Sequence, residues 1–96
     1  MSKLIVVAKV VAKEDAVQQL KSELQKLIAP TRKEEGCLDY VLHQDNEDSL
    51  VFLFYETWES AAALERHFQS DHYQAFGKIA AGLVAEKAVY QMTRIE

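Results

Sequence analysis

Residues 50–58 read Leu50-Val51-Phe52-Leu53-Phe54-Tyr55-Glu56-Thr57-Trp58, and this stretch decides the fold that the rest of the chain must follow. Side chains alternate between the two faces of a β-strand, so the even-numbered residues up to Phe54 share one apolar face. The odd-numbered residues from Val51 to Tyr55 form a second apolar face. A strand that is apolar on both faces is covered on both faces, and we therefore expect this one to lie between two layers.

The pattern around this strand predicts four strands and two helices in the order βαββαβ. The polar run at residues 45–49 is a hairpin loop that joins it to the strand before. Two split βαβ units of this kind predict an α+β, ferredoxin-like antiparallel sheet with both helices on one face, formed by residues 1–96 as a single domain. The expected strands are 3–12, 37–44, 50–58 and 87–95, and the expected helices are 14–35 and 60–83.

Both predicted helices contain an interruption. In the first, Pro30 lies inside a run whose apolar residues recur at helical spacing, so we expect a kink or a junction near Ala29. In the second, Ser60 is placed as an N-cap, and the helix should break near Ser70, where Asp71 can cap a second piece. Each helix is thus expected to have two segments.

A sheet with helices on one side would have a bare opposite face, yet the strand from Leu50 to Trp58 is apolar on both faces. An exposed apolar face of several hundred Å² is rare on a monomer. At ~25 cal/mol per Å², its burial contributes several kcal/mol. We therefore expect a two-fold homodimer packed sheet to sheet, which makes a dimeric α+β barrel.

The composition restricts the partners. The chain has 96 residues and a net charge of −4, with acidic and basic residues interspersed. Binding to nucleic acid needs a basic face, so no nucleic-acid partner is expected. Cys37 is the only cysteine, which excludes a disulfide framework and a clustered thiol metal site. The first predicted strand is apolar but short and contains Lys9, so we expect neither a signal peptide nor a membrane span, and a cytoplasmic location.

Residues 55–76 gather most of the side chains that can do chemistry. They hold two imidazoles, a carboxylate and several aromatic rings in an otherwise aliphatic chain, which is typical of the polar end of an apolar small-molecule pocket. His67 is the candidate general base, because an imidazole titrates near neutral pH, and Glu56 could orient it. The substrate-binding candidates are Trp58, Tyr40 and Phe76, which would pack an aromatic substrate, and His72 or Tyr55, which could donate a hydrogen bond to an oxyanion.

Each of these residues also has a structural interpretation. Trp58 could fill the core or a dimer interface, and Glu56 could bond to a backbone amide or to Arg94. His67 could be a buried imidazole with satisfied hydrogen bonds, and His72 could start a helix at the surface. Their positions in the fold must separate these alternatives from catalysis.

The chain shows no recognisable cofactor motif. It has no G-x-G-x-x-G and no P-loop, and its three glycines are scattered. His67 and His72 would lie about 140° apart around a continuous helix, so they would not chelate one metal ion without the predicted break. We therefore expect no cofactor and no metal, and any oxygen chemistry would take its electrons from the substrate.

Three short motifs carry a family resemblance. They are Glu35-Gly36-Cys37-Leu38-Asp39-Tyr40, Tyr55-Glu56-Thr57-Trp58 and His67-Phe68-Gln69-Ser70-Asp71-His72-Tyr73. In this order and spacing they resemble the antibiotic-biosynthesis-monooxygenase (ABM) family, and within it the small quinol monooxygenases. The resemblance implies a dimeric, ferredoxin-like α+β barrel. It also implies a cofactor-independent oxygenase that uses molecular oxygen on a quinol or similar aromatic, in a pocket inside each subunit.

The same family also contains haem-degrading enzymes, an isomerase of a phosphorylated signalling sugar and proteins without known activity. The positions that match the helical Trp and the axial His of the haem degraders are His67 and Gly77, so both signature residues are missing. Three functions stay open: a quinol-type oxygenase, a non-catalytic small-ligand-binding or stress-associated dimer, and an isomerase. The isomerase would need a basic pocket for phosphate, to which only Arg94, Lys9 and Lys78 could contribute.

Overall fold

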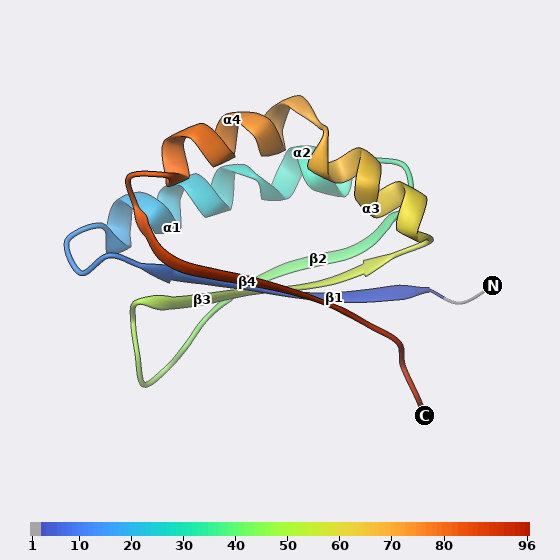
Figure 1. The fold of residues 1–96 in the computed structure, drawn as a ribbon, viewed down its shortest axis with the longest axis horizontal. Helices are drawn as coiled ribbons and strands as arrows, with labels where there is room; N and C mark the ends of the chain where they lie inside the picture. Colours follow the sequence, from blue (N-terminus) through green and yellow to red (C-terminus); the bar gives the residue numbers. More distant parts are fainter. Residues whose placement is uncertain (1–2) are drawn as a thin grey trace.

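The chain folds as a four-stranded antiparallel sheet with its helices on one face (Figure 1). The structure is a computed structural model and describes residues 3–96. In chain order the elements are β1 (Leu4–Ala12), α1 (Val17–Lys26), α2 (Ile28–Arg32), β2 (Cys37–Gln44), β3 (Val51–Trp58), α3 (Ala61–Phe68), α4 (Asp71–Ala80) and β4 (Val84–Met92). The strand order β2-β3-β1-β4 confirms the predicted α+β, ferredoxin-like βαββαβ fold. No helix within the described residues is long and apolar enough to cross a membrane.

The central strands β1 and β3 carry the row of residues on which the site is built. Val6 of β1 pairs with Glu56 of β3, and Glu56 pairs in turn with Tyr40 of β2. Residues paired across a sheet point to the same face, and all three of these are buried. The row therefore places a carboxyl group and a phenol beneath the helical layer.

The first predicted helix consists of two helices, α1 and α2. Their junction lies at Leu27, two residues before Ala29, so the predicted interruption is confirmed. Pro30 has no N–H, and its ring meets the carbonyl of the residue four positions earlier, so the helical hydrogen bonds are interrupted before the proline. The first helix also begins at Val17, three residues later than Glu14. These shifts shorten α1 but keep its buried side on the sheet.

Gly36 closes the turn between α2 and β2. Its φ of 89° lies in the left-handed region, which glycine adopts without the steric cost of a Cβ. A Cβ at this position would lie 2.5 Å from the Cβ of Ala63 on α3. The Gly36 carbonyl also accepts a hydrogen bond from the Glu59 N–H at 2.8 Å. The turn, which also contains Glu34, is thereby held against the start of α3.

The second predicted helix is also divided, into α3 and α4. Ser60 caps α3 as predicted, because its Oγ accepts a hydrogen bond from the Ala63 N–H at 3.1 Å. The cap of α4 is Ser70 rather than Asp71. Its Oγ accepts from the Tyr73 N–H at 3.3 Å, and Asp71 is the first helical residue. The chain therefore turns between the two segments at the predicted place.

The edge strand β4 starts earlier than predicted. It begins at Val84 rather than at Lys87, and it ends at Met92, before the predicted end. The neighbouring strand sets these limits, because Ala12 of β1 pairs with Val84 and Ile5 pairs with Met92. Hydrogen bonding to β1 thus decides the length of β4.

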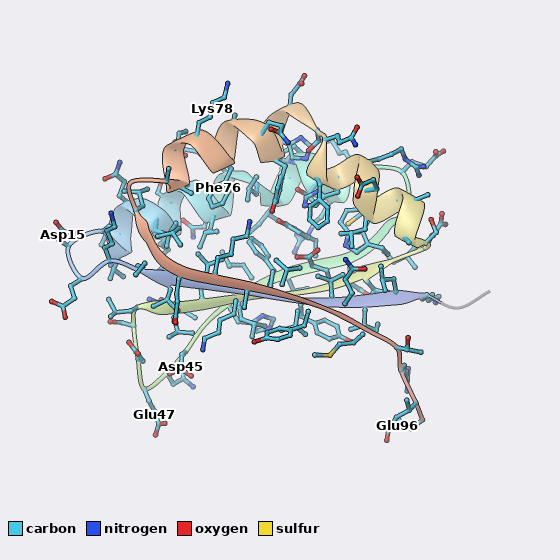
Figure 2. All side chains as sticks on the ribbon, in the orientation of Figure 1. Asp15, Asp45, Glu47, Phe76, Lys78 and Glu96 are labelled. Carbon is cyan, nitrogen blue, oxygen red and sulfur yellow. The ribbon has the colours of Figure 1, made fainter. Side chains whose placement is uncertain are left out.

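The face of the sheet opposite the helices presents apolar side chains. Val41 pairs with Tyr55, and Val7 pairs with both Tyr55 and Tyr90, so these four side chains form one row. Val41, Tyr55 and Tyr90 are 39%, 42% and 49% exposed in the single chain. Side chains project from both faces of the sheet in Figure 2. The predicted helix-free apolar face is present, and the dimer inferred from it stays a prediction.

Candidate active site

A cavity lies between the sheet and the helices. Its walls are mainly apolar, and its space, including the open mouth, is about 390 Å³. The space inside it for the centre of a water-sized sphere is about 30 Å³, so an aromatic ligand requires the lining side chains to move apart. Figure 2 shows Phe76, which lines the cavity, on the side of α4 that faces the sheet, whereas Lys78 points outward. The polar side chains in the wall are Tyr40, Glu56, His67, Tyr73 and Lys87.

His67 lies in the last turn of α3 with its imidazole beneath the helical layer. Leu64 precedes it by one helical turn, so both side chains share the helix face that packs on the sheet, and His67 is 1% exposed. The ring centroids of Trp58 and Tyr73 each lie 4.9 Å from the imidazole centroid. The predicted position of His67, facing the sheet within reach of Trp58, is confirmed. Its catalytic role stays a prediction.

Glu34, which the sequence analysis missed, binds both candidate histidines. Its Oε2 lies 2.7 Å from Nδ1 of His67 and 2.6 Å from Nε2 of His72. The carboxylate stands in the turn before Gly36 and precedes the two histidines by 33 and 38 residues. The glycine two residues later, which marks a turn, is the one sequence signal near Glu34, and it does not identify the partners of the carboxylate.

The shared carboxylate sets the proton positions on both rings. An ionised carboxylate only accepts hydrogen bonds, so the nitrogens that contact Glu34 are assigned as N–H donors. A neutral His67 then carries its proton on Nδ1 and has a lone pair on Nε2. The described residues offer Nε2 no hydrogen-bond partner, and Thr31 Oγ1 is their only fully enclosed side-chain N or O atom without one. His67 is one of the residues that line the cavity, and Nε2 is its nitrogen without a partner.

Burial decides the electrostatic state of the imidazole. It lowers the pKa of His67, while the hydrogen bond and the negative charge of Glu34 act in the opposite direction. The lowered pKa favours the neutral ring at pH 7, which is the form that can accept a proton.

Glu56 has a different partner from the one predicted. Its Oε1 accepts a hydrogen bond from Nε1 of Trp58 at 2.9 Å, so Glu56 orients the indole and Glu34 orients His67. Burial raises the pKa of Glu56 to about 7, against the opposing effect of the Trp58 bond. A carboxyl group with this pKa is partly protonated at neutral pH and can donate a hydrogen bond into the cavity.

Lys87 and Tyr73 form a polar pair in the cavity wall. Nζ of Lys87 donates to the hydroxyl of Tyr73 at 2.7 Å and lies 5.0 Å from the centroid of its ring. Sequence analysis missed Lys87 and considered Lys9, Arg94 and Lys78. Lys9 and Arg94 line hollows on the helix-free side, and Lys78 points outward from α4. The alternation of side chains along β4 could have identified Lys87. It pairs with the core residue Val10 and therefore points to the same face of the sheet.

The other predicted site residues lie in three places. Tyr40 lines the cavity and stacks on Phe54 with ring centroids 4.3 Å apart, and Phe76 lines it from α4. Trp58 is fully buried behind His67. Tyr55 lies on the opposite face of the sheet, away from this cavity, because side chains alternate along β3. The structure therefore does not bring Tyr55 together with the rest.

One group among residues 3–96 has the composition and spacing to hold a metal ion. The donor atoms of Glu34, His67 and His72 all lie within 4.8 Å of one another. A continuous helix would keep the two imidazoles apart, but α3 ends and α4 begins between them. The predicted helix break thus brings both rings to one carboxylate, and the expectation that the chain binds no metal stays a prediction.

The fold and the site define a small α+β, ferredoxin-like protein with an apolar cavity and a carboxylate–imidazole pair in its wall. Residues 3–78 match the sequence profile of the family described as antibiotic biosynthesis monooxygenase, and the chain belongs to this family. The resemblance drawn from the three motifs is thus confirmed.

Individual relatives agree with the family. The chain is 33% identical over 79 residues to the probable quinol monooxygenase YgiN of Escherichia coli, covering 72% of this chain and 74% of that protein. It is 30% identical over 92 residues to the uncharacterized protein sll1783 of Synechocystis, covering 96% of this chain but 63% of that protein. The crystal structure of PA3566 from Pseudomonas aeruginosa superposes with a TM-score of 0.96 at 36% identity, covering 100% of this chain and 97% of that one.

Proposed function

We propose that this protein is a cofactor-independent monooxygenase that oxidises a quinol or another electron-rich aromatic with molecular oxygen. The observation that carries the proposal is the Glu34–His67 pair in the wall of an apolar cavity, in which the carboxylate holds Nδ1 and Nε2 has no partner among the described residues. Membership of the family and similarity to a protein named as a probable quinol monooxygenase support it. A general base in a dry site is what such a reaction requires, because only the substrate anion gives an electron to oxygen readily.

The proposed reaction balances with oxygen as the oxidant. Nε2 of His67 takes the proton of a phenolic hydroxyl, and Glu34 stabilises the imidazolium that results. The anion transfers one electron to oxygen, and the superoxide combines with the substrate radical at a carbon that still bears hydrogen. The peroxide anion formed by this C–O bond takes the proton back from the imidazolium of His67 and becomes a hydroperoxide. Loss of the hydrogen as a proton and cleavage of the O–O bond then give a carbonyl and water.

Other cavity residues have supporting roles in this proposal. Tyr40 and Phe76 pack against the aromatic substrate from the sheet and from α4. The partly protonated Glu56 and the ammonium of Lys87 stabilise negative charge on the reduced oxygen. His72 acts through Glu34, because its contact is with the carboxylate.

We also propose that two copies associate through the helix-free face. The exposed row that contains Val41, Tyr55 and Tyr90 would then be buried against the same row of the partner. The cytoplasmic location predicted from the sequence stays a prediction.

The decisive experiment follows oxygen consumption by chelator-treated protein with reduced naphthoquinones, catechols and related phenols. Wild-type protein should consume oxygen, and His67→Ala should lower the rate by roughly 10²–10⁴-fold. His43→Ala is the matched control, because His43 lies on β2 on the helix-free face, away from the cavity; its mass in light scattering must match that of wild type. Full turnover by His67→Ala would show that the imidazole is structural.

A ligand-binding function predicts a different result. Trp58 is the only tryptophan and lies beside His67, so its fluorescence reports occupancy of the cavity. If the same phenols quench this fluorescence but wild-type protein consumes no oxygen with any of them, the protein binds such ligands without oxidising them.

A further inference from the structure

We propose that Glu34, His67 and His72 form a binding site for a divalent transition-metal ion of the Zn²⁺ type. This inference goes beyond the proposed oxygenase and does not depend on it. It rests on three side chains from three separate segments whose donor atoms converge within 4.8 Å.

The helix break creates the site. His67 lies in the last turn of α3 and His72 in the first turn of α4, with Ser70 between them. Oγ of Ser70 donates to the His67 carbonyl at 2.7 Å and lies 3.2 Å from Nε2 of His72. Ser70 therefore holds both helix ends in the arrangement that turns the two rings toward Glu34. The contact of Ser70 with Nε2 of His72 would give way when that nitrogen binds an ion.

The donor set selects the kind of ion. Two imidazole nitrogens and one carboxylate are ligands of catalytic zinc and of other borderline divalent transition metals, whereas Mg²⁺ and Ca²⁺ prefer oxygen. Three protein ligands leave at least one position for water. The side chains of Glu34 and His72 are 15% and 24% exposed and that of His67 is 2% exposed, so an ion would enter from the solvent side.

A small movement converts the hydrogen bonds into coordination. The carboxylate oxygen is 2.7 and 2.6 Å from the two nitrogens, which is hydrogen-bond spacing. An ion bonded to all three atoms at about 2.0–2.2 Å needs them somewhat more than 3 Å apart. Rotation of the Glu34 side chain, which projects from a turn rather than from a helix, provides this space.

Metal binding would change the hydrogen-bonding character of His67 Nε2. The ion takes Nδ1 of His67, so the proton of the neutral ring moves to Nε2. Nε2 then donates into the cavity and no longer accepts a proton. An ion at this site is therefore expected to inhibit a reaction in which His67 is the base.

The test is calorimetric titration of chelator-treated, tag-free protein with ZnCl₂, without any substrate. Wild-type protein should bind one ion per chain. Both His72→Gln and Glu34→Gln should weaken binding by about tenfold or more. His43→Gln is the control and should bind as wild type does, because it removes an exposed histidine outside the cluster.

Two results would contradict the proposed metal site. No saturable binding would do so, as would binding unchanged in His72→Gln, which would indicate an adventitious ion only. His72 is partly exposed, so this variant is informative even if Glu34→Gln fails to fold. Because the titration contains no substrate, a missing oxygenase activity would not affect its result. If the oxygenase is active, Zn²⁺ should also inhibit wild-type turnover more strongly than that of His72→Gln.

Discussion

Replacement of Glu56 by Gln should remove a fall in the free energy of unfolding that wild-type protein shows as the pH rises. Burial raises the pKa of Glu56 from 4.5 to about 7 in the folded chain. Between these values the unfolded chain has released the proton and the folded chain keeps it. The folded state binds more protons, so the free energy of unfolding falls as pH rises through this window and levels off above it. The glutamine side chain of the variant has no proton to lose, and its oxygen can still accept from Trp58 Nε1.

The size of the effect follows from the shift. A difference of about 2.5 pKa units corresponds to about 3 kcal/mol, because one unit is worth about 1.4 kcal/mol. The two proteins should therefore differ in pH dependence by about 3 kcal/mol between pH 4 and pH 8, with the variant relatively more stable at pH 8. Glu56 is 3% exposed, so little of this effect is screened by solvent.

The assay is urea unfolding at half-unit pH intervals, at one protein concentration and with chelator present. The quantity to compare is the difference between wild type and variant, in which the titration of the other carboxyl groups cancels. Glu65→Gln, an exposed change on α3, should follow wild type at every pH. Parallel curves for wild type and Glu56→Gln would refute the reasoning, because Glu56 would then titrate alike in both states.

The other two predictions concern the backbone and the assembly. Gly36→Ala should destabilise the protein by about 1–3 kcal/mol in thermal unfolding, because of its positive φ and the close approach of α3. Gly77→Ala, in the open interior of α4, should be neutral or stabilising; equal losses for both changes would contradict the steric argument. Tyr90→Arg should shift the mass in light scattering from two chains to one chain of 10.9 kDa, or unfold the dimer, whereas Lys78→Glu on the outer side of α4 should not. A wild-type mass of one chain would refute the dimer.

Local pattern was sufficient for the elements and for the orientation of single residues. Alternating apolar residues predicted β3, the hydroxyl at Ser60 predicted the start of α3, and one helical turn from Leu64 predicted the buried side for His67. Alternation also separates Tyr55 from Glu56, although Tyr55 was assigned to the pocket. These features depend on residues within a few positions of one another, whose geometry is set by the backbone.

The hydrogen bonds of Glu34 with the two histidines could not be predicted from local sequence pattern. The bond from Glu34 to His67 spans 33 residues, and it forms only when the Gly36 turn packs against α3. The bond from Glu34 to His72 further requires the chain to turn at Ser70, which removes the separation that a continuous helix would impose. Such partners are set by how the helices pack on the sheet, because a buried polar group forms its hydrogen bond with the group that the fold places within reach.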